Sequence, residues 1–167
     1  KGQKTFYLAG DPISSTFLAV VGENTPKQLS VPEILPALTS NTVNVINSPA
    51  LAAEQLQWAS RLDHINTMVS GVGIGGLVFS SSKMDSLPAD VKTALTETGK
   101  VAGEALTARI RREDAAAFDR LKGRMTKVEP SADDIAAWNK VFETTRARLK
   151  GSTFNAAVFD AAVAASQ

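Results

Sequence analysis

A short apolar run that ends at a glycine and leads directly into a helix start constrains the fold of this chain more than any other feature. Residues 5–9 are aromatic and aliphatic and stop at Gly10, which is typical of a buried strand. Asp11 can then cap the free N–H groups of a helix, and Pro12 at the first helical position loses no hydrogen bond. The predicted unit is a strand, a turn and a helix.

Similar signals recur along the first half of the chain. Ser30 and Glu33 have the spacing of a capping box and predict a second helix start. A second strand is predicted at residues 43–46, followed by a helix from Ala50 and, further on, a third strand at residues 77–79. Strands that alternate with helices favour an α/β fold with a largely parallel, layered sheet.

Long helices dominate the second half of the chain. One is predicted over residues 86–121, and another begins at Ser131 and Asp134. A final Ala-rich segment, residues 154–165, is also expected to be helical. A chain of 167 residues has room for one domain of ordinary size.

Composition excludes several classes of protein. Lys plus Arg number 18 and Asp plus Glu 17, so the net charge of +1 offers no field for DNA, and no nucleic-acid partner is expected. The absence of cysteine excludes disulfides and cysteine-based zinc sites. The longest apolar stretch, residues 68–79, is broken by Ser70 and four glycines and is shorter than the roughly 20 residues that span a bilayer. Because the chain opens on Lys1 without a signal peptide, we expect an internal fragment.

Motifs of catalysis and cofactor binding are weak. Gly71, Gly73 and Gly76 satisfy G-x-G-x-x-G, but they lead into a predicted strand, whereas a dinucleotide site places them between a strand and a helix. His64 is the only histidine, and a sequence neighbour such as Asp63 is a poor orienting partner for a catalytic base. One histidine without cysteine leaves little to hold a metal. We therefore expect no catalytic residue, no enzyme activity, no metal and no cofactor.

Aromatic and polar side chains gather near the ends of the first two predicted strands. Ligands in open α/β folds bind at the carboxyl ends of strands, where loops and helix starts converge. Core aromatics and turn-forming residues explain the same composition equally well. The residues concerned are Phe6, Tyr7, Asp11, Asn44, Asn47, Ser48 and Pro49.

Three stretches in the same order resemble the solute-binding receptors of tripartite ATP-independent periplasmic (TRAP) transporters, of the dicarboxylate-receptor type. They are the opening K-G-Q-K with the strand after it, residues 30–45 (SVPEILPALTSNTVNV) and residues 76–95 (GLVFSSSKMDSLPADVKTAL). The resemblance covers the chain from Lys1 to about Phe142, and the third stretch is its most specific part.

The resemblance implies a fold and a mode of action. Two α/β lobes joined by hinges close over a ligand in the periplasm, commonly an organic acid, and pass it to membrane permease subunits. The chain then corresponds to a periplasmic-binding-protein-like lobe, a layered sheet with flanking helices followed by long C-terminal helices. This lobe is incomplete without an N-terminal lobe, which lies on a partner chain or has been removed. Residues 1–64 are expected to form the α/β core of the second lobe, residues 65–105 a crossover strand and helix of the N-terminal lobe, and residues 106–167 the C-terminal helices.

The sequence departs from this family at the expected ligand contacts. The family's carboxylate-clamping arginine falls on Phe6, which cannot supply a fork of N–H donors. The ligand-contacting asparagine falls on or near Ser48, and an aromatic position falls near Val31. These changes predict a more hydrophobic, lipid-like or sterol-like solute, and the alternative is a structural or interaction module that has lost solute binding. The expected ligand-binding residues are Phe6, Tyr7, Asp11, Val31, Asn47, Ser48, Pro49 and Trp58.

Overall fold

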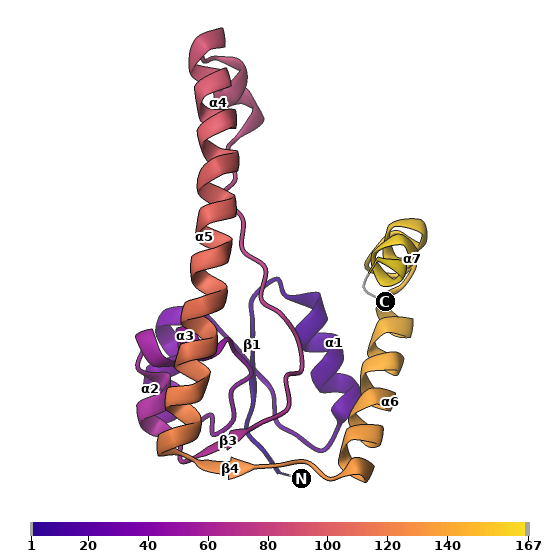
Figure 1. The fold of residues 1–167 in the computed structure, drawn as a ribbon. Helices are drawn as coiled ribbons and strands as arrows, with labels where there is room; N and C mark the ends of the chain where they lie inside the picture. Colours follow the sequence, from indigo (N-terminus) through magenta and orange to yellow (C-terminus); the bar gives the residue numbers. More distant parts are fainter. Residues whose placement is uncertain (1, 166–167) are drawn as a thin grey trace.

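The structure, a computed structural model, describes residues 2–165 and consists of a body from which a long arm projects (Figure 1). The arm is residues 69–110: an extended segment, helix α4 (Ser81–Asp85) and the first part of helix α5 (Ala89–Arg124). The body contains the remaining elements. In chain order these are β1 (Phe6–Leu8), α1 (Pro12–Val21), β2 (Lys27–Leu29), α2 (Val31–Thr39), α3 (Ala50–Gln55), the 3-10 helix η1 (Trp58–Arg61), β3 (His64–Asn66), the end of α5, β4 (Thr126–Val128), α6 (Ala132–Leu149) and α7 (Ala156–Ala164).

Two separate pairs of parallel strands make up the sheets of the described residues. β1 pairs with β2, where Tyr7 lies opposite Gln28, and β3 pairs with β4, where Ile65 lies opposite Lys127. Parallel strands connected through helices confirm the predicted α/β class. The sequence-based expectations missed β2, β3 and β4, because a three-residue strand such as Lys27–Leu29 is too short and polar to show a periodic pattern.

Side chains close to the helix starts account for the accurate helix predictions. Asp11 accepts hydrogen bonds from the N–H groups of the second and third residues of α1, each at 3.0 Å. Reciprocal capping boxes join Ser30 to Glu33 at α2 and Ser131 to Asp134 at α6. The hydrogen bonds from the serine in each box lower the pKa of the partner carboxyl below its ordinary value. These local contacts confirm the predicted starts of α1, α2 and α6.

Two predicted strands are wrong. At residues 43–46 the Asn44 N–H donates to the Lys4 carbonyl at 2.9 Å, but the Lys4 N–H donates to the Asn44 side chain instead of to its backbone carbonyl. A side-chain oxygen therefore replaces the backbone acceptor that would continue a ladder. Residues 77–79 are extended and exposed, and no other described segment pairs with them.

The body is stabilised by two apolar clusters and one aromatic stack. Ile34 and Val43 are fully buried at the centre of the first cluster, which also contains Trp58. The second cluster joins Ala53 of α3 to Leu121 of α5. Helix α6 packs on α1 through a stack in which adjacent ring centroids lie 5.9 to 6.1 Å apart. The residues of this stack are Phe17, Trp138 and Phe142.

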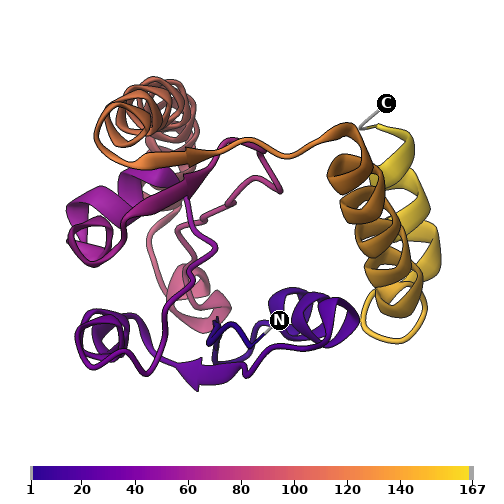
Figure 2. The ribbon, with the colours of Figure 1, turned by 90° about the horizontal axis from the view of Figure 1, so that it is seen from below.

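Helices α5 and α6 lie on different sides of the body. Viewed from below, α5 lies beside α3, and the segment containing β4 crosses to α6, which lies beside α1 (Figure 2). Helix α5 has 36 residues and is therefore about 54 Å long at 1.5 Å per residue. Only its C-terminal part packs on the body, where Ala117 is fully buried.

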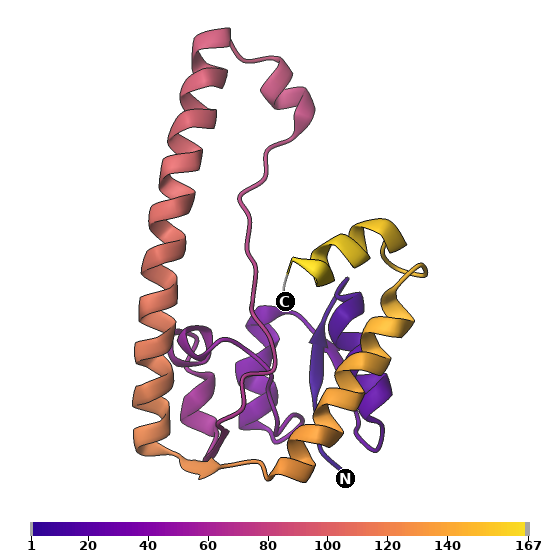
Figure 3. The ribbon, with the colours of Figure 1, turned by 45° about the vertical axis from the view of Figure 1, so that its right-hand side comes forward.

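The arm exposes an unusual amount of apolar surface. The extended segment and α5 both run away from the body and are drawn apart along the arm (Figure 3). Ile74, Leu77 and Val78 are 95%, 87% and 86% exposed, and Val101 on α5 is 68% exposed. Large exposed apolar patches on a protein mark surfaces that bind a partner.

Candidate ligand-binding site

Two of the expected ligand-binding aromatics pack in the core. Phe6 and Trp58 meet edge to face with their ring centroids 6.3 Å apart. Trp58 is only 5% exposed, and Phe6 packs as a half-buried side chain against the same cluster. Neither ring carries a charge, and the Phe6 side chain offers no hydrogen-bond donor.

The remaining expected residues near the start of the chain lie at element ends. Tyr7 is a half-buried residue of β1. Asp11 caps α1 through one carboxylate oxygen, Oδ1, which accepts both hydrogen bonds from the helix start. Val31 is the first residue of α2 and is 42% exposed.

Asn47, Ser48 and Pro49 form the 47–49 loop, which leads directly into α3. The Ser48 hydroxyl donates to the Pro49 carbonyl at 2.9 Å. The side-chain carbonyl oxygen of Asn47 accepts a hydrogen bond from the Ser70 hydroxyl at 3.3 Å. The structure thus brings the three residues together, and the contact with Ser70 engages the oxygen of the Asn47 amide rather than its N–H donors.

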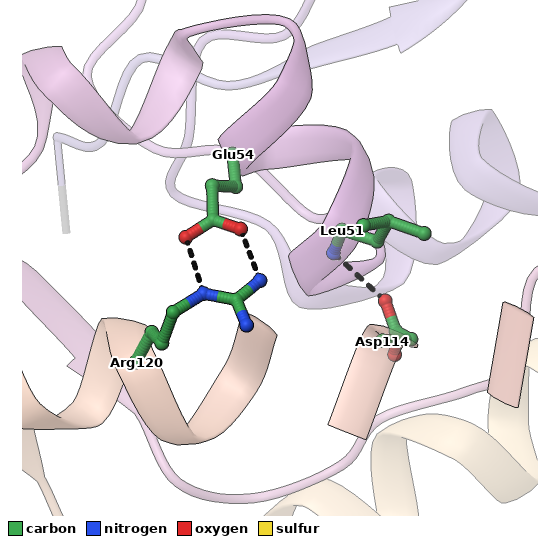
Figure 4. Close-up of polar contacts among 4 residues, drawn as sticks. All are labelled: Leu51, Glu54, Asp114 and Arg120. Atoms are coloured by element: carbon green, nitrogen blue, oxygen red, sulfur yellow. Dashed lines mark hydrogen bonds and ion pairs between the residues drawn. The ribbon is translucent and has the colours of Figure 1, made fainter. Parts of the chain in front are cut away.

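Helix α3 is fastened to α5 by two polar contacts (Figure 4). The Asp114 carboxylate accepts a hydrogen bond from the Leu51 N–H at 2.8 Å. The Arg120 guanidinium donates to both carboxylate oxygens of Glu54, at 3.1 and 2.5 Å. This bidentate pair lowers the pKa of Glu54 and raises the pKa of Arg120.

Sequence reasoning did not identify Asp114, Ser70 or Gly73 as neighbours of the 47–49 loop. Asp114 lies 63 residues from Leu51, and the pair Glu113-Asp114 has the ordinary composition of a helix surface. A Cβ atom built at Gly73 would lie 3.2 Å from Pro49 Cγ, which shows how closely the extended segment passes the loop. Only the tertiary structure reveals these contacts.

Within residues 2–165, no group of three or more His, Cys, Asp and Glu residues is arranged to hold a metal ion. His64 is the exposed first residue of β3. The shallow open depressions found on the described surface lie along the arm part of α5, away from the 47–49 loop. No helix in the described part of the chain is long and apolar enough to cross a membrane.

Parallel strand pairs with flanking helices and a long connecting helix give this chain an α/β architecture. The sequence model of the bacterial extracellular solute-binding proteins of family 7, DctP, matches residues 12–150. The chain therefore belongs to this family of bacterial extracellular solute-binding proteins. No curated protein matches the sequence.

Solved TRAP receptors share the fold over nearly the whole chain. A marine metagenome protein specific for pyroglutamate superposes with a TM-score of 0.77 at 17% identity, over 96% of this chain and 53% of that protein. A succinate-bound protein from Shewanella oneidensis gives 0.76 at 22% identity, over 100% and 54%. An orotate-bound protein from Desulfovibrio salexigens gives 0.70 at 18% identity, over 89% and 48%. The chain spans about half the length of these receptors.

Proposed function

We propose that the chain is the second lobe of a TRAP receptor, which captures a small organic acid between itself and an N-terminal lobe and passes it to a membrane permease. The observation that carries this proposal is the superposition of essentially the whole chain on half of each solved receptor. On this proposal the protein binds and releases its ligand without chemical change.

The exposed arm supports the need for an N-terminal lobe. Its extended segment, which contains the predicted strand at residues 77–79, exposes apolar side chains to solvent. Covering Ile74, Leu77 and Val78 would contribute about 1.5–3 kcal/mol of hydrophobic free energy per side chain. We propose that residues 65–105 belong to the N-terminal lobe, that residues 1–64 form the α/β core of the second lobe, and that residues 106–167 supply its C-terminal helices.

The chemical class of the ligand follows from relatives and from the loop. The solved relatives include proteins bound to pyroglutamate, succinate and orotate, each of which carries a carboxylate. In this chain the neutral donors Tyr7 and Asn47 would hold such a group, because the Ser48 hydroxyl already donates to the Pro49 carbonyl. Phe6 replaces the charged clamp and packs on Trp58. The same Phe6 favours a second candidate ligand, a more apolar acid or lipid-like molecule.

A ligand that co-purifies with the protein tests this proposal. The full-length gene product that carries residues 1–167 would be purified from its native periplasm and examined by native mass spectrometry. We expect a bound mass of a small organic acid that is released on unfolding. A lipid mass would favour the second candidate ligand. A protein free of ligand that also fails to bind both classes on addition would favour a structural or interaction module that has lost solute binding.

A further inference from the structure

The extended segment contacts the 47–49 loop, and helix α5 contacts Leu51 in the first turn of α3, which directly follows the loop. Ser70 and Gly73 lie on the outgoing extended segment, and Asp114 lies on the returning helix α5. We infer that Asp114 is a positioning residue for ligand binding. It holds the start of α3, and with it the 47–49 loop, against helix α5. This inference rests on the proposed function.

The start of α3 has no N-cap side chain of its own that could take the place of Asp114. Helix α3 has only six residues, and an isolated helix of this length is unstable in water. Its N-cap residue is Pro49, whose side chain has no acceptor for the free N–H groups of the first turn. The half-buried Asp114 carboxylate therefore performs the role of an N-cap side chain from another helix.

A second set of contacts fixes the orientation of α3 relative to α5. The Glu54–Arg120 pair binds the far end of α3 to α5, one and a half to two turns beyond Asp114. Ala117 lies between these two polar contacts on α5 and is fully buried, and Leu121, next to Arg120, packs with Ala53 in a common cluster. Helix α3 is thus attached at both ends and moves with the C-terminal part of α5.

The opposite side of the loop is held by the extended segment. The Ser70 hydroxyl donates to Asn47, and the backbone at Gly73 passes so close to Pro49 that an added Cβ would make a tight contact of 3.2 Å with Pro49 Cγ. The loop is thus joined to the outgoing segment, and the start of α3 is joined to the returning helix α5.

The test compares three variants of the full-length gene product. Asp114→Ala removes the acceptor, Asp114→Asn keeps an oxygen atom that can accept from the Leu51 N–H, and Glu113→Ala is the matched control. Glu113 pairs with Arg109 along α5 instead of with the loop. Amide hydrogen exchange would be measured over residues 47–53, and affinity would be measured with pyroglutamate, succinate and orotate.

We expect Asp114→Ala to raise exchange at Leu51 by about fivefold to tenfold, as for the loss of a helix cap. Exchange in the core around Ile34 should stay unchanged. Affinity for the acid that the wild type binds should fall by a similar factor, and Asp114→Asn should recover most of the loss. If affinity and exchange in Asp114→Ala equal those of the wild type, the inference is overturned. An effect of Glu113→Ala as large as that of Asp114→Ala would also overturn it.

Failure of the proposed function would give a different result. If the wild-type protein binds none of the three acids, the proposed ligand class is wrong, and exchange alone decides whether Asp114 holds the loop. A rise confined to residues 47–53 and reversed by Asp114→Asn would support the positioning role. Exchange equal to that of the wild type would overturn it.

Discussion

Arg120 of α5 and Glu54 of α3 form a bidentate ion pair across 66 residues of sequence. The side chain of Arg120 is 55% exposed and that of Glu54 is 24% exposed, so water screens part of the attraction. The fork of two parallel N–H donors makes the pair stronger than a single contact. The pair therefore fixes the geometry between α3 and α5 more than it adds to the stability of the whole chain.

A double-mutant cycle measures this pair. Arg120→Ala and Glu54→Ala should each lower the free energy of unfolding, and the two losses should add up to more than the loss in the double variant. Chemical unfolding at low and high salt would give the coupling energy, which should fall as salt screens the half-exposed pair. The control pair is Asp119 with Lys122, which lies within one helix, makes a single contact and should show weaker coupling. A coupling energy of zero would contradict the structural role of the pair.

Acid should destabilise the body through its capping and ion-paired carboxylates. The pKa values of Glu33, Glu54 and Asp134 are lowered in the folded state, so the unfolded state binds more protons over this range. Their contribution is present above the unfolded values near 4.5 and 3.8 and is lost as the pH falls through the lower folded values. Unfolding by urea from pH 6 to pH 2.5 should show this loss.

Replacing Glu33 by glutamine isolates one contribution to the acid response. The glutamine side chain keeps a hydrogen-bond acceptor but does not titrate, so Glu33→Gln should show a smaller fall in stability between pH 5 and pH 3 than the wild type, by the linkage of protonation to folding. Glu97, an exposed residue on the arm, provides the matched Glu→Gln control. An identical pH dependence in the wild type and in Glu33→Gln would count against the capping box as a source of acid sensitivity.

The aromatic stack should govern the attachment of α6 to α1. Trp138 contacts both Phe17 and Phe142, and we expect Trp138→Ala to lower the free energy of unfolding by about 2–3 kcal/mol. Ile135 lies one turn earlier on α6 and is 42% exposed, so Ile135→Ala should cost less than about 1 kcal/mol. Chemical denaturation followed by circular dichroism compares the two. Equal losses of unfolding free energy in the two variants would show that the stack does not stabilise the interface between α1 and α6.

The exposed arm should make residues 1–167 self-associate when they are produced alone. Its exposed apolar side chains predict binding of a hydrophobic dye and self-association that falls when an N-terminal lobe is co-produced. Leu77→Asp should reduce dye binding and self-association of the chain alone. It should also weaken association with the N-terminal lobe, whereas Lys100→Asp on the exposed face of α5 would serve as the charge-change control. A monomeric chain without dye binding would contradict the proposed covering of the arm.

Local chemistry made part of the fold predictable. Asp11, Ser30 and Ser131 act within three residues of their own positions, so their caps are visible in sequence. The predicted strand at residues 43–46 failed because Asn44 uses its side chain where a ladder needs a backbone carbonyl, a choice that no periodic pattern records. The strand predicted at residues 77–79 finds no partner within residues 2–165.

The candidate site was less predictable, because its supporting contacts are long-range. Turn chemistry predicted that Asn47, Ser48 and Pro49 form a turn leading into a helix, but the strand expected before them is absent from the described residues. Asp114 lies beside Leu51 only because the chain leaves the body along the extended segment and returns to it along α5. Trp58 illustrates the converse, since its aromatic character fits a ligand cleft or a core equally well, and packing buries it in the core.

Ligand binding by the full-length gene product, measured by calorimetry together with small-angle scattering, tests the central claim most directly. We expect one molecule of an organic acid to bind per protein with a Kd in the micromolar range or below, and the radius of gyration to fall as the two lobes close. Binding of none of the carboxylates or apolar acids tested, with a radius of gyration that stays constant, would contradict the assignment of this chain as a working lobe of a solute receptor.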